Sequence, residues 1–367
     1  LLRYDEDPYL VLDDGKLYWM WDAYTVTNMY PYSEPHPGGF NYIRNPVKVT
    51  VDAYNGTIKF YLFDEDEPLA KAYSRIFPGV FVPYREMPDG LKGHIRYPEG
   101  LFRVQADMLT VYHMEDPNIF YNKEDYWEVP SEVYGGTEQR VNPYYTIMRP
   151  PGEEKLQFIL MLPFTPARKN NMIGWLFAKC DGEDYGKLVL YKFPKQRLIY
   201  GPMQIEARID QDAEISQLLT LWSQKGSRVI RGNLLVLPIA DSVIYVEPIF
   251  LLAEKSDLPE LKRVVVATPT RLAMEETFQA ALARVVGRPR PAGEAMPRPV
   301  PALPPPGTAE PGVGVGIEEL ARKALESYRE AERRLREGDW AGYGKALSEL
   351  EKALEALNDR VGGRKRE

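Results

Sequence analysis

The chain has 367 residues, 44% of them hydrophobic and 27% charged, a composition typical of a globular protein with a self-supporting core. Its formal net charge of -7 at pH 7 argues against a general nucleic-acid binder, because such proteins present a basic face. Cys180 is the only cysteine, which excludes an intramolecular disulfide and a cysteine-based zinc site, and the sequence has no run of about 18 apolar residues that would span a membrane.

Two turn motifs near the start of the chain predict β-hairpins. Asp13-Asp14-Gly15 separates two apolar runs, and Asn55-Gly56 lies between the alternating residues 47–51 and the run TIKFYLF. Because Asn and Gly both tolerate a positive φ, the second motif predicts a tight turn of type I′.

Two helices are predicted next. Residues 64–76 have acidic residues in their first turn and a stop at Phe77-Pro78-Gly79. Residues 98–114 start with Pro98 and Glu99. Their spacing places four apolar side chains on one side of the helix: Leu101, Val104, Met108 and Val111.

The rest of the body is predicted to be mainly extended, with a closing amphipathic helix at 272–286. The predicted strands lie near 156–162, 173–180, 187–193, 197–209, 216–222, 228–237, 243–253 and 263–267. Strands and helices alternate without a regular βαβ rhythm, so residues 1–286 are predicted to form an α+β body, with a mixed, largely antiparallel sheet and interspersed helices.

Composition changes after residue 286. Residues 287–316 are rich in Pro and Gly, which predicts an extended, partly disordered linker. Residues 317–360 show apolar positions three and four apart on either side of Gly338-Asp339, which predicts an antiparallel helical hairpin. Residues 361–367 form a basic tail.

One acidic cluster is a candidate metal site. Asp210, Asp212 and Glu214 alternate, so on an extended backbone their carboxylates would lie on one side, where Ca²⁺ accepts several oxygen ligands. An EF-hand is excluded by Ile215 at the sixth position and Leu221 at the twelfth. A solvated turn is the structural alternative.

The segment PFTPARKNNMIGW is a candidate ligand-binding loop. Its polar donors beside an aromatic ring suit anions or sugars, and the residues are Arg168, Lys169, Asn170, Asn171 and Trp175. The structural alternative is a long loop held by its own amides. The Tyr-rich segment DAYTVTNMYPYSEP at 22–35 resembles an aromatic platform for sugars or peptides, although such rings also anchor loops.

No catalytic signature is apparent. The three histidines, His36, His94 and His113, form no helical zinc pair, and no Gly-x-Ser-x-Gly elbow is present. A carboxylate pair for glycoside cleavage cannot be identified from sequence, because the pair is defined by spatial separation. The sequence therefore predicts no catalytic residue and no cofactor.

Long phrases of the chain resemble the uncharacterised protein family 0182, a group of large bacterial membrane proteins. They include DPYLVLDDGKLYWMWDAYTVTNMYPYS at 7–33 and PFTPARKNNMIGWLFAKCDGEDYGKLVLYKFPK at 163–195, and they continue to about residue 286; REGDWAGYGKAL at 336–347 is similar to the family's tail. The resemblance implies that a transmembrane N-terminal region is missing here, which fits a chain that opens without methionine, and that this portion lies outside the membrane, on the extracytoplasmic side. It transfers no catalytic residue.

Two functional hypotheses follow from these observations. The first is a non-enzymatic extracytoplasmic domain that binds an envelope protein or glycan or scaffolds an assembly, with the family's transmembrane region as its partner and no role in nucleic-acid binding. The alternative is an envelope hydrolase that acts on a glycan or a similar substrate, with its carboxylate pair hidden by sequence distance.

Overall fold

The structure is a computed structural model that describes residues 1–194, 196–223, 226–239, 242–253 and 258–287. It also describes positions 326, 327, 329, 330, 333, 334, 345, 346, 348–350 and 352, which are helical. The chain divides into two compact units, residues 1–291 and 292–367. The predicted linker (287–316), hairpin (317–360) and basic tail (361–367) otherwise lie outside the described residues and stay predictions.

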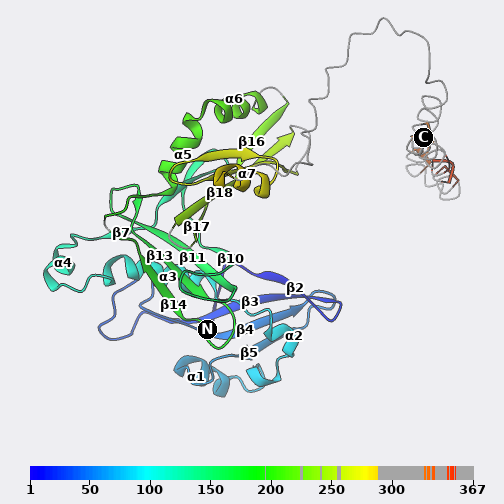
Figure 1. Ribbon diagram of the computed structural model, residues 1–367. Helices are drawn as coiled ribbons and strands as arrows, with labels where there is room; N and C mark the ends of the chain where they lie inside the picture. Colours follow the sequence, from blue (N-terminus) through cyan, green and yellow to red (C-terminus); the bar gives the residue numbers. More distant parts are fainter. Residues whose placement is uncertain are drawn as a thin grey trace, which may run out of the picture. The chain divides into compact units, whose positions relative to one another are not determined.

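The α+β prediction is confirmed: nearly all strand pairs are antiparallel, and helices are interspersed among them (Figure 1). The N-terminal sheet has the order β1-β3-β4-β5-β6, with β2 paired to β3 as well, and β5 and β6 are parallel. Its strands are β1 (Arg3–Tyr4), β2 (Tyr9–Asp13), β3 (Lys16–Thr27), β4 (Tyr42–Asp52), β5 (Ile58–Leu62) and β6 (Phe81–Pro83).

Both predicted hairpins form, but the type I′ turn predicted at Asn55-Gly56 is wrong, and the tight turn lies in the first hairpin. Asp14 and Gly15 have φ values of 46° and 71° and join β2 to β3, as a two-residue turn of type I′ requires. The connection from β4 to β5 is longer, since residues 53–57 lie between the strands and only Gly56 among them has a positive φ. The Asp52 carboxylate accepts the backbone N–H groups of Tyr54 and Asn55 there, which stabilises the wider turn.

The two predicted N-terminal helices are present, with shorter bounds for the first. Helix α1 (Pro68–Ile76) is capped by the Glu67 carboxylate, which accepts the Ala70 N–H at 2.6 Å. Helix α3 (Glu99–Tyr112) buries Phe102, Ala106 and Thr110. The stripe from Leu101 to Val111 that the sequence places on one side is only half-buried. Short elements complete this region: η1 (Tyr84–Glu86), α2 (Asp89–Lys92) and α4 (Pro117–Asn122).

The buried side of α3 packs on the middle sheet. Phe102 and Ala106 share a core cluster with Trp127, Leu160 and Phe164. The sheet consists of β7 (Trp127–Glu128), β10 (Tyr144–Met148), β11 (Gln157–Pro166), β13 (Gly174–Lys179) and β14 (Leu188–Lys192), and beside it lie the hairpin β8 (Ser131–Tyr134) and β9 (Thr137–Arg140) and the pair β12 (Asn171–Met172) and β15 (Ile199–Tyr200).

The third sheet contains the main errors of the sequence prediction. Two predicted strands, 197–209 and 216–222, are largely the helices α5 (Pro202–Gln211) and α6 (Ala213–Trp222), and the predicted helix 272–286 is a strand followed by a helix. Ile205 and Ile209 are four residues apart and both fully buried, so the 3.6-residue period of a helix was present. The remaining elements are β16 (Ser227–Arg231), β17 (Leu235–Ile239), β18 (Ser242–Ala253), β19 (Glu260–Ala267), β20 (Leu272–Glu275) and α7 (Phe278–Val286).

Candidate functional site

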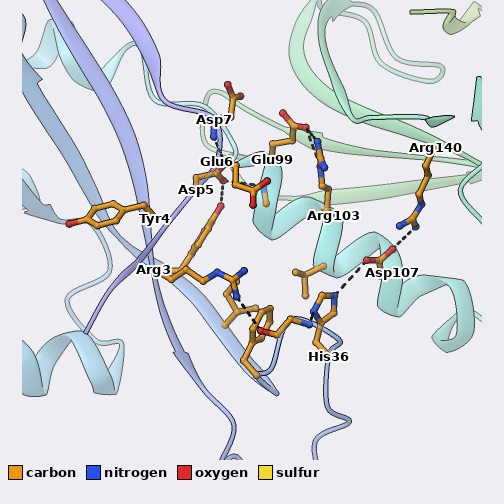
Figure 2. Close-up of a pocket in the computed structure, with 16 residues that line it drawn as sticks. Arg3, Tyr4, Asp5, Glu6, Asp7, His36, Glu99, Arg103, Asp107 and Arg140 are labelled. Atoms are coloured by element: carbon orange, nitrogen blue, oxygen red, sulfur yellow. Dashed lines mark hydrogen bonds and ion pairs between the residues drawn. The ribbon is translucent and has the colours of Figure 1, made fainter. Parts of the chain in front are cut away.

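Three hollows adjoin one another along helix α3. Their volumes are about 610, 460 and 1050 Å³, and His36 lines all three. The first and third also share Asp107 and Arg140, and the second and third share Tyr112. Because they share these residues, we treat the three hollows together as the α3 groove, and Figure 2 shows the first of them.

A chain of charged side chains crosses the groove. The Asp107 carboxylate on α3 is 2.5 Å from the Arg140 guanidinium on β9 and 3.6 Å from His36 Nε2, in the loop between β3 and β4 (Figure 2). His36 Nδ1 accepts the backbone N–H of Gly38 at 3.0 Å. Because Nδ1 accepts a hydrogen bond, the proton of the neutral imidazole is on Nε2, which faces Asp107. The contacts of Asp107 with His36 and Arg140 connect three separate segments across the groove.

A second set of charges lies at the start of α3. Arg103 pairs with Glu99 one helical turn away, and Figure 2 shows both beside Asp7. Burial raises the pKa of the Glu99 carboxyl; Arg103 opposes the shift, and the carboxylates of Asp7 and Asp5 add to it. A carboxyl with a raised pKa in a hollow is typical of functional sites.

The second hollow adds an apolar and aromatic wall. Leu101, Val104 and Met108 of α3 line it, which explains why the apolar stripe of this helix is not buried in the core. Tyr30 and Tyr112 line it as well and are 54% and 52% exposed, so their rings are available to a ligand. The groove therefore offers ring faces and apolar contacts beside charged hydrogen-bonding groups.

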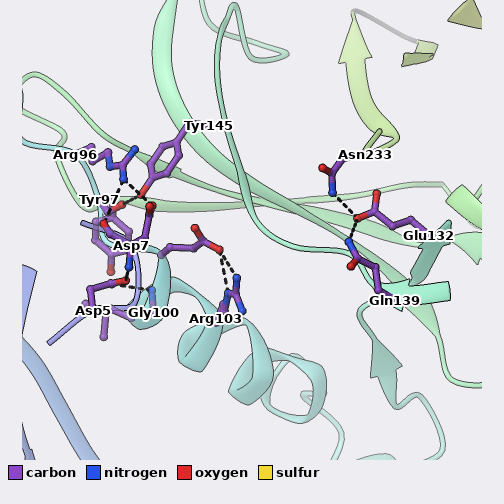
Figure 3. Close-up of polar contacts among 12 residues, drawn as sticks. Asp5, Asp7, Arg96, Tyr97, Gly100, Arg103, Glu132, Gln139, Tyr145 and Asn233 are labelled. Carbon is purple, nitrogen blue, oxygen red and sulfur yellow. Dashed lines mark hydrogen bonds and ion pairs between the residues drawn. The ribbon is translucent and has the colours of Figure 1, made fainter. Parts of the chain in front are cut away.

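The first turn of α3 is fixed by a buried carboxylate. Asp5 accepts the hydroxyl of Tyr24 and the Gly100 backbone N–H, the latter at 3.0 Å. Figure 3 shows this contact beside the pair of Arg96 with Asp7, whose N–O distance is 2.6 Å. A carboxylate at a helix N-terminus is favoured by the helix dipole, so these contacts hold α3 in place against the N-terminal strands.

The predicted ligand-binding residues are separated by the structure. Arg168, Lys169 and Asn170 are exposed, and Arg168 lines the third hollow of the α3 groove. Asn171 belongs to β12 and pairs with Tyr200. Trp175 is fully buried in another cluster, with Ile159, Met161 and Phe177. Grouping Trp175 with the polar loop is therefore wrong; a binding role for the loop stays a prediction.

The three predicted metal ligands are held by other partners. Asp210 pairs with Arg231 at 2.7 Å, Asp212 caps α6 by accepting the Ile215 N–H at 3.1 Å, and Glu214 is 3.7 Å from Arg284. The extended backbone on which the prediction rested is wrong, since these residues lie at the end of α5 and the start of α6. No group of three or more His, Cys, Asp or Glu side chains in the described ranges is placed to hold a metal ion.

Arg231 is the centre of a buried acidic cluster that the sequence does not reveal. Its guanidinium pairs with Glu206, with Asp210 and, at 2.5 Å, with Glu247. Nearby, the buried Glu132 carboxylate accepts hydrogen bonds from the side-chain amides of Asn233, at 2.8 Å, and Gln139, at 3.1 Å (Figure 3). The Glu206 and Glu247 side chains are at most 2% exposed, whereas Asp210 lies at the exposed edge of the cluster, so the two buried carboxylates have a structural role.

Sequence reasoning missed most of the groove. The signal that would have located it is the second apolar stripe on α3, because Phe102 and Ala106 already supply a buried face. The Tyr-rich segment 22–35 does contribute Tyr24 and Tyr30. In the part of the chain that the structure describes, no helix is long and apolar enough to cross a membrane.

Comparison with known proteins identifies relatives across almost the whole chain. The model of the Uncharacterised protein family (UPF0182) matches residues 1–222. Curated proteins named UPF0182 protein are 57% identical over 360 residues in Moorella thermoacetica, 53% over 361 in Pelotomaculum thermopropionicum and 52% over 364 in Desulforamulus reducens. Each alignment covers 98% of this chain and 39% of the relative, so the chain spans about two fifths of the length of these relatives. No solved structure matches.

Proposed function

The chain belongs to the Uncharacterised protein family (UPF0182), and on that premise we propose that it is the ligand-binding part of a longer membrane protein and lies on the extracytoplasmic side of the envelope. The α3 groove is the proposed binding site, and a glycan chain of the envelope is the proposed ligand. The transmembrane region of the longer protein anchors this part and is its permanent partner.

The groove's combination of surfaces carries the proposal. Sugar rings have apolar faces that pack on aromatic side chains, and Tyr30 and Tyr112 present half-exposed rings. Sugar hydroxyls donate and accept hydrogen bonds, and Asp107 and Arg140 provide both functions on the same groove. The three adjoining hollows form a long open site, which suits an extended polymer better than a compact metabolite.

Binding is tested with an array of bacterial envelope glycans, followed by calorimetric titration of the tightest ligand. Tyr30→Ala and Tyr112→Ala should each weaken binding by about tenfold, because each removes a ring contact worth about 1.4 kcal/mol. Tyr121→Ala is the matched control, since Tyr121 is 86% exposed on α4 and does not line the groove. No glycan bound by the unaltered chain, or equal losses in all three variants, would contradict the proposal.

The envelope location has its own test. A reporter phosphatase that is active only outside the cytoplasm is fused after Glu367 of the longer natural chain. Phosphatase activity in intact cells is expected, and a fusion that is made but inactive would contradict an extracytoplasmic location.

A hydrolase is the second candidate, and Glu99 is the observation that favours it. A carboxyl of raised pKa can serve as a general acid in glycoside cleavage when a second carboxylate is free to act opposite it. The negative charges of Asp5 and Asp7 contribute to the raised pKa of Glu99. However, Asp5 already accepts hydrogen bonds from Tyr24 and Gly100, and Asp7 forms an ion pair with Arg96. We therefore favour binding. Release of reducing sugar ends from a bound glycan, abolished by Glu99→Gln, would favour the hydrolase instead.

A further inference from the structure

The outer face of the N-terminal sheet is apolar across four strands. In register, Leu10 of β2 lies beside Trp19 of β3, Trp19 beside Val51 of β4, and Val51 beside Ile58 of β5. Leu12 of β2 and Leu17 of β3 form a second cross-strand pair next to this row. We call the combined surface the outer apolar face, and its residues are Leu10, Leu12, Leu17, Trp19, Val51 and Ile58.

These side chains remain open to solvent within the described residues. Leu10, Leu12, Trp19 and Ile58 are 48%, 62%, 43% and 55% exposed. Further along the same strands, Ala23, Val47 and Val49 on this face are buried in a small cluster. The partly buried side chains that pack against this cluster all come from residues 2–81. The exposed part of the face therefore lacks a second layer within the described part of the chain.

The opposite face of the sheet is buried in the protein core. Val11, Met20 and Tyr61, which alternate with the outer residues, are buried in a core cluster with Met87 and Leu91. An antiparallel sheet with one solvated face alternates apolar and polar residues, whereas strands apolar on both sides are covered on both sides. The sequences YLVLD of β2 and KLYWMW of β3 have the second pattern.

We propose that the outer apolar face is a docking surface for the remaining part of the longer chain. The curated relatives have about three fifths of their length outside the region that matches this chain. A segment of the same polypeptide is present at a high effective concentration and is therefore favoured over a separate partner. Large exposed apolar patches on soluble units mark such contact surfaces. The inference shares with the proposed function only the longer chain and is independent of the α3 groove.

Thiol labelling at introduced cysteines tests this contact, because the one natural cysteine of residues 1–367 does not interfere and any others in the full chain are first replaced by serine. Cys180 is fully buried, and burial raises the pKa of its thiol to about 11. Leu12→Cys and Ile58→Cys are made separately in residues 1–367 and in the full natural chain, and maleimide labelling rates are compared. Glu138→Cys, at an exposed position on β9, is the control.

We expect both face cysteines to react freely in residues 1–367 and at least tenfold more slowly in the full chain, while the control reacts equally in both. Equal rates for the face cysteines in the two chains would overturn the proposal. Protection already present in residues 1–367 and increasing with protein concentration would also overturn it and would identify a second copy as the occupant. Glycan binding by the same variants is measured alongside, so that a failure of the groove and a failure of this surface are told apart.

Discussion

At the scale of single residues, Arg231 connects three acidic side chains in the described part of the chain. It faces three carboxylates, those of Glu206, Asp210 and Glu247, and two of these are buried. One guanidinium cannot neutralise three carboxylates, and desolvation penalises each buried charge. Burial accordingly raises the pKa of Glu247 to about 7, although Arg231 opposes the shift.

The raised pKa of Glu247 makes stability depend on pH. Its folded-state pKa lies above its ordinary value of 4.5, so its stabilising contribution is complete below about pH 4.5 and is lost as the pH rises through about 7. We expect the unaltered chain to lose about 3 kcal/mol relative to Glu247→Gln between pH 4.5 and pH 8. Urea unfolding of both proteins across this range measures the difference, and parallel curves would refute the assignment.

Removing the Arg231 guanidinium should lower the free energy of unfolding more than removing any one of its carboxylate partners. Arg231→Met leaves buried carboxylates without a cation and is expected to cost about 3–5 kcal/mol. Arg228→Met on the same strand is the matched control, because Arg228 is exposed and should change stability by no more than about 0.5 kcal/mol. The free energy of unfolding is compared at pH 7. Similar losses in both variants would show that the cluster is not a structural centre.

At the scale of elements, the position of α3 determines the groove. The start of the helix is held by the Asp5 carboxylate, which also accepts a hydrogen bond from the Tyr24 hydroxyl, and both side chains are buried. Tyr24→Phe removes this donor and should cost about 1–3 kcal/mol of unfolding free energy. Tyr54→Phe is the control, since that ring is 67% exposed. If both substitutions were neutral in urea unfolding, the Asp5 contact would not be what anchors α3.

Element type could be predicted where the local signal was strong. Asp13-Asp14-Gly15 predicted the first hairpin, and Pro98-Glu99 predicted the start of α3, because turn and cap chemistry act within a few residues. Residues 197–209 and 216–222 were predicted as strands although Ile205 and Ile209 have helical spacing and Asp212 is a helix cap. The groove was not predictable, since it brings together His36, Asp107 and Arg140 from distant segments. Trp175 was misassigned because it lies in β13, whose residues are buried on both sides, and a short apolar run does not reveal this.

For the whole molecule, the first compact unit should be stable without the second. All buried clusters in the described residues lie before residue 287. Truncation to residues 1–291 is therefore expected to leave the melting temperature of this unit unchanged. Truncation to residues 1–276 removes α7, whose Ala281 and Val285 are buried, and should lower it by several degrees. A large fall in the first truncation would show that the C-terminal unit supports the body.

A glycan bound in the α3 groove should protect the backbone that lines it, and hydrogen–deuterium exchange with and without the glycan measures this protection. We expect slower exchange in the backbone amides of residues 28–44 and 99–112, which contribute to the groove, and little change in residues 202–222. Protection confined to other segments, or none at a saturating glycan concentration, would contradict this expectation.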